Sequence, residues 1–144
     1  AWALQRSTVP AIDVDADAVT TAQALGWLSD AGAQLGTTAR LRSRESLMAA
    51  LDAQGAVHWR LLERTRPERA SISMSRFARD AYEWPEGVTP FELRDEDLAL
   101  DGAPLSAATP QGLFAALRRT QERHRALLWL LGQQRNYWDV TLPG

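Results

Sequence analysis

Residues 121–140 read QERHRALLWLLGQQRNYWDV, and this stretch constrains the fold more than any other. It joins a polar triplet, Glu122, Arg123 and His124, to a Leu/Trp-rich run that ends at Gly132. Glycine just past a periodic apolar run is typical of a helix C-terminus, because it adopts the left-handed conformation without strain. The stretch therefore predicts a helix end that holds polar groups against apolar ones.

The same helix has a clear beginning further upstream. Thr109 fits the N-cap, and Pro110 fits the first turn, where the N–H that proline lacks would be unpaired anyway. Leucines and His124 then recur at helical spacing. We expect one long final helix over about residues 110–131, with Trp138 folding the tail back onto it.

A second strong helical pattern lies in the middle of the chain. Ser43 precedes it and Pro67 ends it, because proline disfavours a helical conformation at the residue before it. Gly55 inside this pattern indicates either a close packing point for another helix or a bend, and we favour close packing. The residues that recur at helical spacing are Leu47, Leu51, His58 and Leu62.

Two shorter features separate these helices. A short helix is expected from about Ser71 or Ser73 to Tyr82, because serine is a good N-cap. Asp101 and Gly102 form a pair that is typical of tight turns between strands. We therefore predict a short β-hairpin near residues 97–105.

These patterns predict a mainly α fold: a single α-rich domain over residues 1–144, with a short β-hairpin inserted before the last long helix. A further helix is expected from Asp15 or Asp17 to about Ala31. The chain does not begin with methionine, so we also consider it a fragment of a longer chain. Three large side chains are expected in a core between the two long helices: Trp59, Trp129 and Trp138.

Composition excludes several classes of function. The formal net charge of −2 gives no basic field for nucleic acid or anionic lipid, although all sixteen basic residues are arginine. The chain has no cysteine, and no apolar run approaches the roughly 20 residues of a membrane span. Phosphate-binding glycine loops and serine-nucleophile motifs are absent. We expect a cytoplasmic protein that neither enters a membrane nor needs a cofactor.

Three stretches together resemble a known bacterial family. ERHRALLWLLG with YWDV is similar to the end of the uncharacterised domain of unknown function 4272, LRSRESLMAALDAQGAVHWRLLE to its His-Trp helix, and DEDLALDGAPL to its hairpin. The resemblance covers roughly residues 40–140. Leu128 stands where the family usually has asparagine, and the tail has Asp139 alone where two aspartates are common. The resemblance implies a helical fold and no known activity.

Both histidines of the chain fall on apolar faces of predicted helices. If these helices pack together, His58 and His124 approach each other, and Glu122, Arg123 or Asp139 could join them. One interpretation is a structural polar network that sets helix register, since buried polar groups need partners. The alternative is an acid–base site with His124, Glu122 and His58 as catalytic candidates. A divalent metal held by these groups is the weakest reading, and we expect none.

A candidate contact surface lies in the loop EWPEG. Trp84 could fold back onto the core or serve as an exposed anchor beside Glu83 and Glu86, since tryptophan dominates many interfaces. Our first hypothesis is a non-catalytic bacterial protein-interaction module, either an adaptor or a toxin-neutralising or secretion-associated partner, which binds another protein. The alternative is a small hydrolase or transferase that uses a His/Glu acid–base pair.

Overall fold

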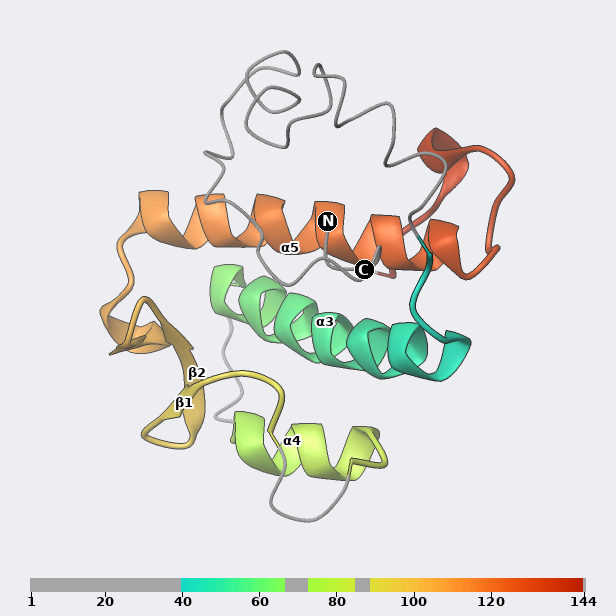
Figure 1. Cartoon of the computed structure of the whole chain (residues 1–144). Coiled ribbons are helices and arrows are strands. Elements are labelled where there is room, and N and C mark those ends of the chain that lie inside the picture. The colour runs from blue at the N-terminus through green and yellow to red at the C-terminus, as the bar shows by residue number, and fades with distance from the viewer. Residues whose placement is uncertain (1–39, 67–72, 85–88, 144) are drawn as a thin grey trace. The chain divides into compact units, whose positions relative to one another are not determined.

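The computed structural model describes residues 40–66, 73–84 and 89–143, and the predicted helix from Asp15 or Asp17 lies outside them (Figure 1). The chain divides into two units, residues 1–47 and 48–144, and each is considered by itself. The mainly α fold is confirmed. Its helices are α3 (Arg44–Thr65), α4 (Met74–Ala81) and α5 (Pro110–Leu130), with short 3-10 turns η2 (Leu105–Ala107) and η3 (Tyr137–Asp139).

The helix ends form where capping residues predict them. Thr109 Oγ1 accepts a hydrogen bond from the Gly112 N–H at 3.1 Å, and Pro110 begins α5. Gly132 follows α5 with φ +85°, the left-handed conformation that ends a helix. Ser73 caps α4 in the same way, since its Oγ accepts from the Arg76 N–H at 3.3 Å. Local capping chemistry thus determines both ends of α5 and the start of α4.

The predicted hairpin is present and is part of a larger antiparallel meander. Strands β1 (Leu93–Arg94), β2 (Asp97–Leu100) and β3 (Ala103–Pro104) pair in the order β1-β2-β3. Two-residue loops join them, and all four loop residues have positive φ, as primed hairpin turns require. Asp101 and Gly102 form the turn that the sequence predicts. The turn at Asp95 and Glu96 carries no such signal, so β1 was missed.

Helix α3 contributes to two separate hydrophobic clusters. Its Ala56 packs with Met74 and Ala78 of α4, in a cluster surrounded by aromatic side chains. Its Leu61 packs with Leu98 of β2 and Leu105 of η2, and apolar residues of α5 close this second cluster. Figure 1 shows α3 between α4 and α5. The meander and α4 therefore share α3 as their support.

Two of the three predicted core tryptophans are not in the core. Trp129 is 41% exposed and Trp138 is 76% exposed, whereas Trp59 is half-buried and stacks on Phe77 with ring centroids 3.7 Å apart. The prediction that Trp138 folds the tail back onto α5 is wrong. Tyr137 does this instead, through its hydrogen bond to Glu122, and Val140 further along the tail is buried. Helical periodicity does not specify which aromatic residue of the tail turns inward.

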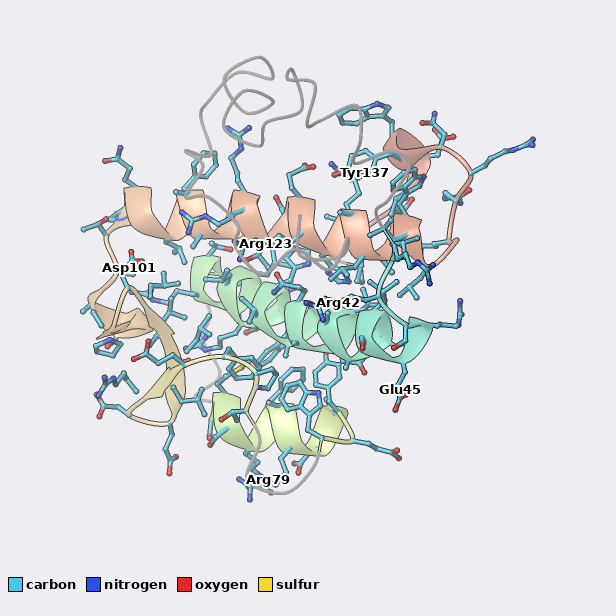
Figure 2. All side chains as sticks on the ribbon, viewed as in Figure 1. Arg42, Glu45, Arg79, Asp101, Arg123 and Tyr137 are labelled. Carbon is cyan, nitrogen blue, oxygen red and sulfur yellow. The ribbon has the colours of Figure 1, made fainter. Side chains whose placement is uncertain are left out.

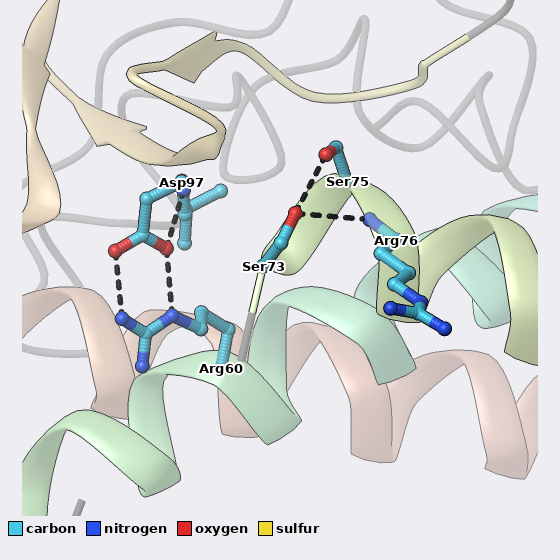
Figure 3. Close-up of polar contacts among 6 residues, drawn as sticks. Arg60, Ser73, Ser75, Arg76 and Asp97 are labelled. Carbon is cyan, nitrogen blue, oxygen red and sulfur yellow. Dashed lines mark hydrogen bonds and ion pairs between the residues drawn. The ribbon is translucent and has the colours of Figure 1, made fainter. Parts of the chain in front are cut away.

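An ion pair fastens the meander to α3. Arg60 Nε and Nη2 each donate to one oxygen of the Asp97 carboxylate at 2.6 Å, and both side chains are largely buried (Figure 3). The hydrogen bond to Asp97 raises the pKa of the Arg60 guanidinium. The same carboxylate accepts the Leu98 N–H at 2.8 Å. Two parallel hydrogen bonds of this kind fix the orientation of the carboxylate relative to the guanidinium as well as the distance between them.

We expect a double-mutant cycle on Arg60→Ala and Asp97→Ala to give a coupling energy of about 1.5–3 kcal/mol, because hydrogen bonds to charged groups are stronger than neutral ones. Chemical denaturation of the four proteins measures it. The matched control is the exposed pair Arg94 and Glu92, for which about 0.2–1 kcal/mol is expected. Equal coupling energies for the two pairs would contradict the inference that the Arg60–Asp97 ion pair holds the meander against α3.

Candidate functional site

The two histidines meet in the interior of the second unit. His58 Nδ1 on α3 lies 3.2 Å from His124 Nδ1 on α5, and the rings are nearly perpendicular, at 87°. The side chains are 3% and 4% exposed. The sequence predicts that the two histidines approach each other if their helices pack together, and the structure places them side by side. One ring must donate its N–H while the other accepts with its lone pair.

Burial favours the neutral form of both rings. It lowers the pKa of His58, and it lowers the pKa of His124, which the neighbouring His58 lowers further. A hydrogen bond between two ring nitrogens also requires that at least one ring is uncharged. His58 Nε2 is buried without a hydrogen-bond partner. Protonating both rings would place two positive charges side by side in a poorly solvated position.

A cavity of about 280 Å³ lies beside the histidine pair. Most of its lining comes from one face of α3, because residues four and seven apart lie on the same side of a helix. Helices α4 and α5 and the tail supply the other walls. The lining residues are Leu51, Asp52, Gly55, His58, Trp59, Leu62, Arg66, Phe77, Tyr82, His124 and Pro143.

Gly55 makes room for Tyr82 in this cavity. A Cβ at position 55 would lie 2.9 Å from Tyr82 Oη and 4.0 Å from His124 Cε1. The close approach predicted at Gly55 is therefore present, and its main partner is a phenol. Burial raises the pKa of Tyr82, and the charge of Asp52 raises it further. Burial also raises the pKa of Asp52 itself.

Glu122 lies in a different network from the histidines. Its Oε2 accepts the Tyr137 hydroxyl at 2.6 Å and its Oε1 accepts Arg125 Nη1 at 2.7 Å. Burial and the bond to Glu122 raise the pKa of Tyr137 to about 12. Figure 2 shows Tyr137 at the C-terminal end of α5. Tyr137 thus binds Glu122, the carboxylate that the sequence offers as a partner of His124.

The remaining predicted network residues are also separate from the histidine pair. Within residues 40–66, 73–84 and 89–143, no hydrogen bond joins Glu122, Arg123 or Asp139 to either ring. Arg123 is largely exposed on α5. Partial withdrawal of its guanidinium from water lowers its pKa, and the charge of Arg119 lowers it further. The hydrogen bond between the rings thus joins the two histidines alone, and Glu122 belongs to a separate group with Tyr137 and Arg125.

Trp84 folds back onto the core, one of the two readings that the sequence allows. Its ring stacks on Tyr82 with centroids 5.1 Å apart and meets Phe91 edge to face. The side chain is half-buried, so it contributes to the aromatic cluster around α4. Glu83 is exposed, and Glu86 lies outside the described residues. A contact surface at Glu83 stays a prediction.

Sequence reasoning missed an exposed aromatic cluster at the end of the chain. Trp129, Tyr137 and Trp138 meet edge to face, with centroids 6.0 and 5.0 Å apart. Trp129 Nε1 also donates to the Arg135 carbonyl at 3.4 Å.

The described residues can also be searched for metal-ligand groups and for membrane-spanning helices. The described ranges contain no group of three or more His, Asp or Glu side chains placed to hold a metal ion. No helix among them is both long and apolar enough to cross a membrane.

Comparison with known proteins gives no relative for this chain. No family model matches it, and neither a curated protein nor a solved structure matches it. The resemblance to domain of unknown function 4272 therefore stays a prediction that rests on the quoted residues.

Proposed function

We propose that this chain is a non-catalytic protein-interaction module, and that it contacts its partner through one exposed face of α5 and the tail. We call this surface the aromatic–arginine face. It comprises Phe114, Arg118, Arg125, Trp129 and Trp138. The observation that carries the proposal is the exposure of three large aromatic side chains on this surface: 61% for Phe114, 41% for Trp129 and 76% for Trp138.

Helical geometry makes these residues one surface. Phe114, Arg118, Arg125 and Trp129 are spaced by four, seven and four residues, so they fall within about 60° of each other around α5. The stripe extends about 22 Å along the helix. Trp138 continues it, because Tyr137 touches both Trp129 and Trp138. A stripe of this length suits a helix or strand of a partner protein.

The charges of this face favour an acidic partner. Of the four arginines of α5, Arg118 and Arg125 lie on this face, and Arg125 is ion-paired to Glu122 at 2.7 Å. Arg118 lies over the Phe114 ring and Arg125 over the Tyr137 ring, each guanidinium carbon 5.9 Å from the ring centroid. Tryptophan, tyrosine and arginine are the residues that contribute most binding energy in protein interfaces. An acidic surface with apolar pockets would complement Arg118 and the exposed aromatic side chains of this face.

An adaptor or a toxin-neutralising or secretion-associated partner is the concrete form of this proposal. The alternative, a small hydrolase or transferase, uses His124 and Glu122 together as an acid–base pair. The hydrogen-bond partner of His124 is His58, while Glu122 binds Tyr137 and Arg125. The interaction module is therefore the better-supported function.

We expect Trp138→Ala to weaken partner binding by about tenfold or more, since an interface tryptophan contributes about 2 kcal/mol. The partner is first captured by a photo-crosslinking residue placed at position 118 of the full chain in the native host. Its affinity for the purified variant is then measured by calorimetry. Trp138→Ala should leave the melting temperature nearly unchanged, because the side chain is largely exposed.

Met48→Ala is the matched control, because Met48 is 40% exposed but lies on α3, away from this face. It should bind the partner as the wild type does. Crosslinking that yields only a second copy of this chain would overturn the proposal of a different, acidic partner. Unchanged affinity of Trp138→Ala would overturn the assignment of the surface.

A further inference from the structure

We propose that the cavity beside the histidine pair binds a small organic cation, a protonated or methylated amine, with Asp52 as its counter-ion. This site is separate from the aromatic–arginine face, because its lining comes mainly from α3 and α4. The proposal rests on an unpaired carboxylate, an aromatic lining and a lining arginine whose charge is already paired with a glutamate.

Asp52 is the first observation. Its side chain is half-buried on α3 and lines the cavity, yet among the described residues it has neither a hydrogen bond nor an ion pair. Burial accordingly raises its pKa. A carboxylate that is partly withdrawn from water is stabilised by an opposite charge at close range. A cation in the cavity would supply that charge.

The aromatic lining is the second observation. Trp59, Phe77 and Tyr82 all border the cavity. Ring faces and phenol oxygens attract cations whose charge is spread over methyl or methylene groups, and such contacts strengthen where water is excluded. Trp59 and Phe77 stack on each other, which holds their rings in place without a ligand. The walls are therefore formed before binding, which limits the entropy that binding would cost.

Little positive charge opposes a cation here. Burial lowers the pKa of both His58 and His124, so the two imidazoles favour their neutral forms. Arg66 is the one arginine of the lining, and its Nη1 donates to Glu63 Oε1 at 2.8 Å. Its charge is thus compensated by an acid outside the cavity.

The volume of the cavity and the chemistry of its lining narrow the class of ligand further. A volume of about 280 Å³ lies at the lower end of typical ligand pockets, which run from roughly 300 to 1,000 Å³. An inorganic divalent ion would need several oxygen ligands, whereas the lining offers one carboxylate and one phenol. A small amine, with one charge and an apolar body, matches both the volume and the walls.

The test uses choline and its uncharged analogue, in which a carbon atom replaces the quaternary nitrogen. Both are titrated into the full wild-type chain while amide and indole resonances are followed by nuclear magnetic resonance. We expect choline to saturate the shifts of Trp59 and Gly55, and to bind about tenfold or more tightly than the neutral analogue. Equal affinities for the two compounds would overturn the proposal without any variant.

Asp52→Asn supplies the second arm, because it removes the charge and keeps the shape. We expect choline affinity to fall by about tenfold or more, while Asp101→Asn, at an exposed turn, leaves it unchanged. Thermal unfolding checks that both variants fold. Choline binding that Asp52→Asn does not weaken, or no saturable binding of choline to the wild type, would overturn the site.

Discussion

Replacing Leu61 by alanine is expected to lower the free energy of unfolding by about 3 kcal/mol. Leu61 is fully buried, and it packs against Leu98 of β2 and Leu105 of η2. Removing the side chain loses its transfer free energy and leaves a cavity that the neighbouring helix and meander fill only in part. The effect is large because one residue of α3 holds both the meander and the start of the η2–α5 connection.

Chemical denaturation at constant pH measures this loss. Met48→Ala is the matched control on the same helix, and we expect it to cost less than about 1 kcal/mol, because Met48 is 40% exposed. A cost for Leu61→Ala no greater than that of Met48→Ala would show that the second hydrophobic cluster is not packed as described.

Acidification from pH 8 to pH 5 is expected to destabilise the fold through the histidine pair. Burial lowers the pKa of His58 and of His124 from the ordinary value of 6.5, so the unfolded chain takes up protons first. A group with a depressed folded-state pKa stabilises the fold above its unfolded pKa. That contribution is lost as the pH falls below about 6.5 towards the folded-state pKa.

The change in the free energy of unfolding per pH unit shows how many histidines take up a proton only in the unfolded chain. Each proton that only the unfolded chain binds lowers the free energy of unfolding by about 1.4 kcal/mol per pH unit. Two histidines that both stay neutral when folded would therefore give up to about 2.7 kcal/mol per pH unit. Denaturation midpoints measured at several pH values between 8 and 5 provide the slope.

His124→Gln is the informative variant, because glutamine keeps hydrogen-bonding groups but does not titrate. We expect it to reduce the slope by about half, since only His58 then remains to titrate. Comparing the two slopes removes the contribution of carboxylates, including Asp52, whose raised pKa acts in the opposite direction at lower pH. A wild-type stability that is flat between pH 8 and 5 would contradict the enclosed neutral pair.

The ends of the helices could be predicted from the sequence because their causes are local. Thr109, Pro110 and Gly132 act within one turn of their own positions, and each has the role in α5 that its chemistry predicts. The same is true of Ser73 at α4 and of the turn at Asp101 and Gly102.

The candidate site was predictable only in part. Two histidines on apolar helix faces predicted that their rings could meet, and they do. The cavity beside them was not predictable, because it depends on how α4 places Tyr82 against Gly55. The partner of Glu122 could not be predicted either, because Tyr137 reaches it only after the chain reverses beyond Gly132.

By itself, the sequence determined the helical class, the extent of α5 and the presence of a hairpin, since periodicity and capping depend on neighbours along the chain. Tertiary structure decided which aromatic residues are buried. Trp138 is exposed whereas the adjacent Tyr137 is half-buried and bonded to Glu122, and Trp84 is half-buried against Tyr82. The reason is physical: burial depends on surfaces brought together from distant parts of the chain, and hydrophobicity alone does not specify which of two adjacent rings will meet them.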